Sequence, residues 1–449
     1  MTAADTPSQA VGAAVNPLDV PALDTSDDQA LRAPSPCDWK ASLEVIHRPT
    51  SHQTFSLPGG RSLGYATYGA ETGPTIFYLH GLGDCRLTGA WYHDAGLESG
   101  VRIVAVDRPG IGLSDQHVGR TVLDHAEDIR LLARHLKAAT YSVMGVSGGG
   151  IYALACAHAL PADELRSVAV VAGMGPFDLT MSHSNWTTYT FFNMSKLLPS
   201  IIRWAYSKEL EQLNTQSLED FISTTQTRSK AWYVPYIGPD AKDMALMRDD
   251  DFVACVYESL REVCKHGIED HMIEREVICA SNLGFTVSEI RPTLPITLWY
   301  GRRDASLSPA VGQAIRDAIG GSARLITRDE AHLSLVIGPS GPASPNLCAL
   351  IQAHEGNSKR DGDPPEDAVD KKAANNLELA GRQDGHTFGD LRAAAKATDR
   401  LRKAKAWCIT SFQRKTKKLE HRFGIKFRRG RMSKWGAHAY CDKEVKAMR

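Results

Sequence analysis

The stretch that decides the fold spans Gly145 to Gly149 and has the sequence GVSGG. The run before it, residues 141–144, is apolar and β-branched, which predicts a buried strand. The run after it, residues 151–157, is rich in helix formers. A serine at such a corner is held on a sharp turn with its hydroxyl exposed, and small neighbours let a carbonyl approach. The pattern makes Ser147 a candidate nucleophile.

This serine needs two partners, because a hydroxyl becomes a good nucleophile only when a base takes its proton and a carboxylate orients the base. Asp304 follows the apolar run 295–300, which is predicted to be a strand. His332 follows the short run 323–327, which is also a predicted strand. Reactive residues of open α/β sheets gather at the carboxyl ends of the strands. We therefore expect Ser147, Asp304 and His332 to meet at one edge of a sheet.

Each of these residues also has a structural alternative. Ser147 could be one more small residue of a tight turn, and His332 could be a structural member of the 16 histidines. Asp304 could be the carboxylate at a helix N-terminus. Asp329, three residues before His332, is its rival as the acid. The position of Asp304 directly after a strand favours Asp304.

A second loop offers the groups that would stabilise a reaction intermediate. The apolar run 75–79 is a predicted strand, and it leads into residues 80–84, with the sequence HGLGD. A backbone N–H from this loop and the N–H after the nucleophile would together bind a developing oxyanion. These are the amides of Leu82 and Gly148. Asp84 in the same loop could tune it.

Four motifs, taken in order, resemble a known family. Residues from about 50 to 355 resemble a serine-dependent α/β-hydrolase of the esterase, lipase and lactonase group. The motifs are His80-Gly81, Asp107 to Ser114, Gly145 to Gly149, and Gly301 to Asp304 followed by His332. The resemblance implies an α/β-hydrolase fold, a mostly parallel sheet flanked by helices. It implies much less about the substrate.

The predicted elements along the chain agree with an α/β fold. Segments 53–57 and 61–68 are predicted to form a hairpin, and strands and helices then alternate as far as residue 171. Such alternation favours a mostly parallel sheet with helices on both faces. From about 177 to 290 the chain is helical and aromatic, and an insertion at this point would lie over the active site as a cap. Its aromatic side chains either line an apolar substrate pocket or form the core of the cap itself.

The two ends of the chain differ in composition from its centre. Residues 1–44 are predicted to be disordered, residues 45–355 to form the hydrolase domain, and residues 356–390 to be a polar linker. Residues 391–449 form a basic tail: from residue 401 onward 16 Lys and Arg stand against three acidic residues, although the whole chain has no net charge. Such a tail is either solvated and disordered, or a nuclear signal, an RNA contact or an acidic-membrane patch.

Cysteine usage and hydropathy bear on the compartment. The nine cysteines show no C-x-x-C or metal-ligand spacing, and no apolar leader opens the chain. Thiols in a reducing, cytoplasmic compartment fit best, with the nucleus an alternative if the tail is a signal. No run of about 20 apolar residues predicts a transmembrane helix. Acyl transfer by a triad requires no metal or organic cofactor, and the oligomeric state stays open.

These residues together predict a serine hydrolase. It would cleave a carboxylic ester, lactone or thioester of a small apolar acyl group through an acyl-enzyme. The same nucleophile and amides would also serve an acyltransferase or a carbon–carbon hydrolase in secondary metabolism. A third possibility is a non-catalytic, hydrolase-like binding protein that interacts through the basic tail, with nucleic acid as one class of partner.

Overall fold

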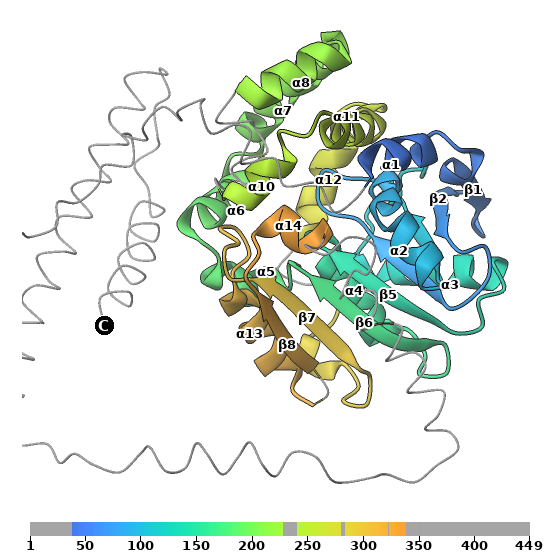
Figure 1. The fold of residues 1–449 in the computed structure, drawn as a ribbon. Coiled ribbons are helices and arrows are strands. Elements are labelled where there is room, and N and C mark those ends of the chain that lie inside the picture. The colour runs from blue at the N-terminus through green and yellow to red at the C-terminus, as the bar shows by residue number, and fades with distance from the viewer. Residues whose placement is uncertain (1–37, 228–239, 280–282, 322, 338–349, 351–449) are drawn as a thin grey trace, which may run out of the picture. The chain divides into compact units, whose positions relative to one another are not determined.

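One sheet forms the centre of the part of the chain that the structure describes (Figure 1). The computed structural model describes residues 38–227, 240–279, 283–321, 323–337 and 350. Within them eight strands pair in the order β1-β2-β4-β3-β5-β6-β7-β8. Their bounds are Gln53–Ser56 (β1), Ser62–Gly69 (β2), Thr75–Leu79 (β3), Arg102–Val106 (β4), Tyr141–Val146 (β5), Leu165–Val171 (β6), Ile296–Gly301 (β7) and Ala323–Arg328 (β8).

The sheet is mostly parallel, as the alternation of strands and helices predicts. β1 and β2 form the expected antiparallel hairpin, and β2 also runs antiparallel to β4. Every later pair, from β4 with β3 to β7 with β8, is parallel. β3 and β5 are buried along their whole length, because a parallel sheet is covered on both faces and its strands are continuous apolar runs.

The register of the central strands brings their carboxyl ends to one edge. Leu79 of β3 pairs with Gly145 of β5, and Val146 of β5 pairs with Val171 of β6. Further along the sheet, Gly301 at the end of β7 pairs with Arg328 at the end of β8. The loops that follow these strands therefore all begin at the same edge, and they carry the candidate site residues.

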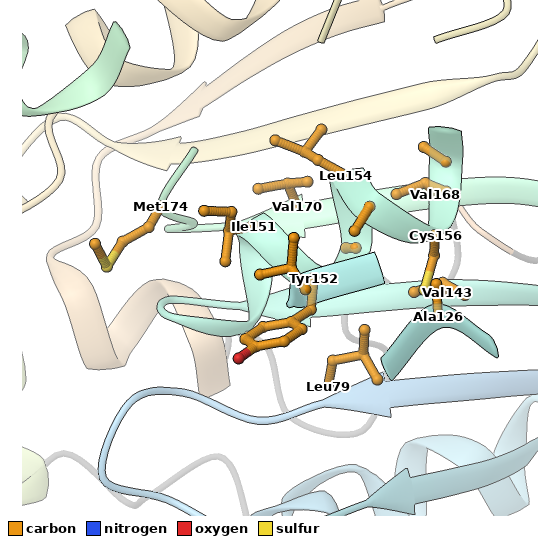
Figure 2. Close-up of a cluster of buried hydrophobic side chains, with 14 of the residues drawn as sticks. Leu79, Ala126, Val143, Ile151, Tyr152, Leu154, Cys156, Val168, Val170 and Met174 are labelled. Carbon is orange, nitrogen blue, oxygen red and sulfur yellow. The ribbon is translucent and has the colours of Figure 1, made fainter. Parts of the chain in front are cut away.

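Alternate side chains of the strands pack on opposite faces of the sheet. Phe77 and Leu79 of β3 belong to one buried cluster, whereas Ile76 and Tyr78 belong to another. Helices over the first face are α3 (Val122–His135), α4 (Gly149–Ala159) and α13 (Pro309–Ile319). Figure 2 shows part of the first cluster, in which Tyr152 and its neighbours on α4 lie against strand side chains. The second face is covered by α1 (Trp39–Ile46), η3 (Arg86–Tyr92), α2 (His93–Glu98) and α14 (His332–Ile337).

A helical insertion, residues 177–290, separates β6 from β7, as the sequence predicts. In Figure 1 most of its helices gather beyond one end of the sheet, next to α14. Its described elements are α5 (Phe177–Thr180), η4 (Met181–His183), α6 (Trp186–Leu197), α7 (Pro199–Thr215), α8 (Leu218–Thr227), α10 (Ala241–Leu246), α11 (Asp250–Cys264), α12 (Glu269–Ile278) and η5 (Val287–Glu289). None of the helices in the described ranges is both long and apolar enough to cross a membrane.

The N-terminal boundary differs from the expectation of disorder through residue 44. Helix α1 begins at Trp39, after Asp38, whose side chain accepts the N–H of Ala41 at 3.0 Å as an N-cap. Trp39 is 2% exposed and packs edge-on against Phe252 of α11, with ring centroids 4.8 Å apart. Sequence periodicity misses this helix because it is only eight residues long. Residues 1–37, the predicted linker 356–390 and the predicted tail 391–449 lie outside the described residues.

Candidate active site

Ser147 lies on the turn between β5 and α4, in the left-handed backbone region, with φ of 50°. This conformation is rare for a residue with a side chain and costs free energy. Three hydrogen bonds hold it. The N–H of Ser147 donates to Val171 O at 3.0 Å, and its carbonyl accepts the N–H of Gly150 at 3.0 Å and of Met174 at 2.8 Å. The turn is therefore fixed from both sides.

Close backbone contacts explain why glycines flank Ser147. A Cβ added to Gly149 would lie 2.1 Å from the carbonyl oxygen of Leu79, and one added to Gly145 would lie 2.4 Å from the carbonyl oxygen of Gly149. Both distances are far shorter than any van der Waals contact. Residues with a side chain are thus excluded at both positions, which is the geometry that the GVSGG pattern predicts.

The structure brings together the serine, the histidine and one of the two candidate acids. His332 Nε2 lies 3.1 Å from Ser147 Oγ, and His332 Nδ1 lies 2.7 Å from Asp304 Oδ2. The other oxygen of Asp304 accepts the backbone N–H groups of Ser306 at 2.7 Å and Leu307 at 2.9 Å. Asp304 is 5% exposed and His332 7%. A proton on Nδ1 donated to Asp304 leaves Nε2 able to accept the proton of Ser147.

The rival acid does not reach His332. Asp329 has a side chain that is 61% exposed, and it forms an ion pair with Arg303 at 3.8 Å. Its carboxylate lies on the surface, three residues before the histidine in sequence but without a hydrogen bond to the imidazole in the described part of the chain. The position of Asp304 after β7 is what places it beside His332.

The pKa of His332 is raised above its usual value. Burial by itself disfavours the imidazolium, but three carboxylates outweigh it. Asp304 contributes most, followed by Asp243 and then Asp84. The histidine is thus surrounded by anions that favour its protonated form.

Two backbone amides lie side by side next to the serine. A Cβ added to Gly148 would be 2.8 Å from the amide nitrogen of Leu82. Neither the Leu82 nor the Gly148 N–H donates a hydrogen bond to another group in the described part of the chain. The two residues that the sequence predicts as oxyanion donors thus lie close together beside Ser147.

Arg108 fixes the loop that carries Leu82. Its guanidinium donates to the carbonyl oxygen of His80 and, at 2.7 Å, to that of Gly81. The Gly81 carbonyl and the Leu82 N–H belong to one planar trans peptide, so they point in opposite directions. The hydrogen bond from Arg108 therefore orients and polarises the Leu82 N–H. The sequence patterns give no sign of this role for Arg108.

Arg108 is itself held by a buried carboxylate. Glu274 of α12 lies 2.6 Å from Arg108 Nε and 2.6 Å from Arg120 Nη2, and all three side chains are at most 1% exposed. Burial would raise the pKa of Glu274, but the two guanidinium groups lower it to about 2. The helical insertion is thus tied electrostatically to the loop next to Ser147.

Two other aspartates, Asp107 of the second motif and Asp115 directly after it, bind backbone N–H groups. Asp107 accepts the N–H of Arg86 at 2.7 Å and of Leu113 at 2.9 Å, and it forms a buried ion pair with the Arg86 side chain. Asp115 accepts the N–H of Ser62 at 2.7 Å. Both carboxylates fix loops at the edge of the sheet.

Asp84 lines the pocket next to Ser147, and its pKa differs from the usual value for an aspartate. Burial raises its pKa to about 6, although Arg108 and His332 act in the opposite direction. Its carboxylate is close to Gly81, since a Cβ there would be 2.5 Å from Asp84 Oδ2. The group therefore changes charge near neutral pH beside the histidine.

A third contact of the histidine comes from the helical insertion. The carboxylate of Asp243, on α10, accepts the backbone N–H groups of His332, Leu333 and Ser334 at 2.9–3.1 Å. The neighbouring Lys242 forms an ion pair with Glu330 at 2.7 Å. α10 thus holds the segment that contains His332. Nothing in the local sequence indicates this, because Asp243 and His332 are 89 residues apart.

A pocket opens beside Ser147 and His332. Most of its lining is apolar and comes from both the sheet body and the insertion. Its lining residues are Leu82, Gly83, Asp84, Trp91, Val146, Ser147, Met174, Thr188, Phe192, Tyr206, Met247, Val256, Leu260, Arg275, Ser306, Leu307, His332, Leu333 and Val336. Of the aromatic residues that the sequence places in the insertion, Phe192 and Tyr206 line the pocket, whereas Trp204 is 65% exposed. Trp232, Tyr233 and Tyr236 lie outside the described residues.

With this geometry established, comparison with known proteins identifies the family. Residues 74–339, more than half of the chain, match the family model for the alpha/beta hydrolase fold. The chain belongs to the α/β-hydrolase fold family. The expected fold and family are therefore confirmed, and the prediction of a hydrolase agrees with them.

Several solved structures are similar to the chain at low identity. A structure from a study of Nitrososphaera gargenis carboxylesterases is 16% identical, covers 69% of this chain and 100% of its own, and has a TM-score of 0.47. The enol-lactonase from Burkholderia xenovorans LB400 is 22% identical, covers 63% and 93%, and has a TM-score of 0.40. The esterase from Exiguobacterium antarcticum is 14% identical, covers 67% and 99%, and has a TM-score of 0.45. No curated protein matches the chain.

Proposed function

We propose that this α/β-hydrolase cleaves a carboxylic ester, lactone or thioester through an acyl-enzyme on Ser147. The observation that carries the proposal is the hydrogen-bonded chain from Ser147 Oγ through His332 to Asp304, at 3.1 and 2.7 Å. Such a chain is the arrangement that activates a serine hydroxyl. Its position at a strained turn and beside a largely apolar pocket supports the same function.

In the first half of the reaction, Ser147 Oγ attacks the substrate carbonyl carbon, and His332 Nε2 takes the serine proton. The carbonyl oxygen becomes an oxyanion that accepts the N–H groups of Leu82 and Gly148. Asp304 stabilises the imidazolium and keeps its orientation. The bond to the leaving group then breaks as His332 gives its proton to the departing oxygen or sulfur, which leaves an acyl ester on Ser147.

In the second half, water replaces the leaving group. His332 takes a proton from the water as its oxygen attacks the acyl carbon, and the same two amides bind the second oxyanion. Collapse of this intermediate releases the carboxylic acid and returns the proton to Ser147 Oγ. The residues of the chain are sufficient for every proton transfer in this scheme.

The helical insertion serves as the cap of this site. Phe192, Tyr206 and Met247 of the insertion line the pocket together with body residues such as Leu82 and Leu307. A substrate enclosed between them loses most of its contact with water, which strengthens the electrostatic effect of the oxyanion amides. The apolar lining favours a small apolar acyl or alcohol group.

A direct test measures the hydrolysis of p-nitrophenyl acetate and butyrate by the wild type and by Ser147→Ala. We expect the variant to lose at least about three orders of magnitude in kcat while its circular dichroism spectrum and Tm stay close to the wild type. Ser223→Ala, at an exposed serine of α8, is the matched control and should keep wild-type activity. Activity retained by Ser147→Ala would contradict the proposal. Methanol added to the reaction separates hydrolysis from acyl transfer by its products.

A further inference from the structure

Asp84 carries the one carboxylate that lines the pocket in the described part of the chain. The residue is half-buried. Within the described residues no ion pair includes Asp84 and no side chain donates a hydrogen bond to it, while one backbone N–H, that of Gly81, favours its ionised form. The buried polar atoms without partners in these residues do not include its oxygens, so the carboxylate is accessible from the pocket. An ionised carboxylate can accept about four hydrogen bonds, and most of this capacity is therefore open to a bound molecule.

This carboxylate is close to the proposed nucleophile. A Cβ added to Gly81 would lie 2.5 Å from Asp84 Oδ2 and 3.5 Å from Ser147 Cβ. The missing side chain of Gly81 thus leaves room for the carboxylate on the side of the loop that faces Ser147. When Ser147 Oγ attacks a substrate carbonyl, the atoms next to that carbonyl lie near Asp84.

The basic side chains of the pocket wall are engaged elsewhere. His332 Nδ1 lies 2.7 Å from Asp304 Oδ2, and His332 Nε2 lies 3.1 Å from Ser147 Oγ. Arg275 Nη1 donates to Tyr206 Oη at 3.0 Å, and its guanidinium stacks on the Tyr206 ring. Most of the remaining lining is apolar. A hydrogen-bond donor for the pocket carboxylate therefore has to come from water or from a bound molecule.

Arg108 compensates the charge of Asp84 only in part. The guanidinium lowers the pKa of Asp84 electrostatically, but it donates to the carbonyls of His80 and Gly81 and pairs with Glu274 at 2.6 Å. Burial has the larger effect and raises the pKa of Asp84 to about 6. A carboxyl group whose pKa is raised by burial carries a negative charge that its surroundings stabilise poorly.

A bound substrate makes the compensation of this charge more important. An apolar group that fills the pocket removes water from the carboxylate and leaves a buried charge without a partner, which costs free energy. A group with an N–H or O–H replaces the water by a charge-assisted hydrogen bond, which is stronger than a neutral one. The pocket should therefore discriminate between substrates of equal size that differ only in such a donor.

We propose that Asp84 determines specificity, and that the substrate carries a hydrogen-bond donor, an amino or a hydroxyl group, close to its scissile carbonyl. The substrate class is then an amino- or hydroxy-substituted ester, lactone or thioester. The remainder of the substrate is apolar, like most of the pocket lining. The inference rests on the proposed function and adds a specificity to it, since the donor group binds to Asp84 and takes no part in the reaction.

Matched esters test this inference at pH 8, where Asp84 is ionised. In one series a methyl, hydroxyl or amino group occupies the same position of the acyl chain, at successive distances from the carbonyl, and in the other series it occupies the alcohol chain. The three groups are similar in size, so the esters differ mainly in the donor. Release of acid is followed with a pH-stat. We expect at least one hydroxyl or amino ester to exceed its methyl counterpart at least about tenfold in kcat/KM.

Two variants connect this preference to the carboxylate. Asp84→Asn removes the charge and should reduce the ratio of kcat/KM between the preferred and the methyl ester, and Asp84→Leu removes both acceptors and should bring this ratio close to one. A disturbed loop would slow the hydrolysis of all three esters equally and leave the ratio unchanged. Asp243→Asn is the matched control, because Asp243 also acts electrostatically on His332 but does not line the pocket, so it should keep the wild-type ratio.

The outcomes separate the inference from the proposed function. If the wild type hydrolyses the esters but prefers no hydroxyl or amino ester, the inference is wrong and the proposed hydrolase function stands. The same holds if Asp84→Asn and Asp84→Leu both keep the wild-type preference. If folded wild-type protein hydrolyses no ester of either series, the proposed function fails and the inference fails with it.

Discussion

The carboxylate of Asp243 accepts the backbone N–H of His332 at 3.0 Å, and it contributes to the raised pKa of the imidazole. Asp243 belongs to the helical insertion, and His332 follows the last strand of the sheet. The insertion therefore contacts the proposed general base directly. Three carboxylates, those of Asp304, Asp243 and Asp84, interact electrostatically with this histidine, and the hydroxyl of Ser147 lies within hydrogen-bond distance of it.

Replacement of Asp243 by Asn tests whether this contact sets the basicity of His332. The variant keeps the side-chain shape but removes a negative charge and replaces one of the two accepting oxygens by an NH2 group. The imidazolium is then less stabilised, and the pKa of His332 falls. We expect the acid limb of the kcat/KM profile to move to lower pH by about 0.5 unit or more, with a lower kcat. Lys242→Met is the control, because it removes the neighbouring ion pair with Glu330 without removing an anion from His332. An acid limb that does not move in Asp243→Asn would show that the contact is structural only.

The wild-type pH profile follows from the same pKa. His332 must be neutral to accept the proton of Ser147, and its pKa is raised above the usual value near 6.5. Activity should therefore fall as the pH is lowered through an inflection above 6.5. Steady-state kcat/KM between pH 5 and 9 measures it. An inflection below 6.5 would mean that burial outweighs the surrounding carboxylates.

The raised pKa of His332 also affects the free energy of unfolding, because proton binding and folding are thermodynamically linked. Because the folded-state pKa of His332 is raised, its contribution to the free energy of unfolding is fully present below the unfolded pKa. It is lost as the pH rises through the folded pKa. His332→Gln should therefore remove a stabilisation that is larger at pH 6 than at pH 9. Urea denaturation of the two proteins at both pH values gives the comparison, and an equal difference at both would contradict it.

Arg108 offers a test of the oxyanion amides. Arg108→Lys keeps the charge near Glu274 but cannot hold the carbonyls of His80 and Gly81 together, so the Leu82 N–H is less well oriented. We expect kcat to fall about 10²–10³-fold, as for loss of one oxyanion donor, with a smaller change in KM. Arg120→Lys is the matched control, because Arg120 shares Glu274 but does not donate to either of these carbonyls. Equal losses in both variants would assign the effect to the ion pair instead.

Gly149 tests the steric argument for the turn. An alanine there would place its Cβ 2.1 Å from Leu79 O and 2.7 Å from His80 O, both backbone atoms that cannot rotate away. We expect Gly149→Ala to lose about 1–3 kcal/mol of unfolding free energy, or to fail to fold. Chemical denaturation measures this loss. A variant as stable as the wild type would mean that the turn adapts easily.

The sequence was sufficient to predict the residues whose place depends on strand ends. Ser147, Asp304 and His332 each follow a strand, and parallel strands bring such residues to one edge. The role of the Leu82 and Gly148 amides was inferred from local patterns in the same way, and it stays a prediction.

The contacts made by the helical insertion could not be predicted in this way. Asp243, Glu274 and Thr188 reach the site through the packing of helices far from it in sequence, and no local periodicity specifies that packing. Their residue types gave no signal either, since an aspartate or threonine in a helix is usually on the surface. The N-cap at Asp38 is different: an Asp before an apolar turn is a local signal for a helix start, and it marks α1.

Covalent labelling with a fluorescent fluorophosphonate, followed by mass spectrometry of the labelled peptide, tests whether Ser147 is an activated nucleophile. We expect a single adduct on Ser147 in the wild type and no adduct in Ser147→Ala. We also expect much slower labelling in His332→Gln, because the serine then lacks its base. Folded wild-type protein that does not react, or an adduct on a different residue, would contradict the assignment of Ser147 as an activated nucleophile.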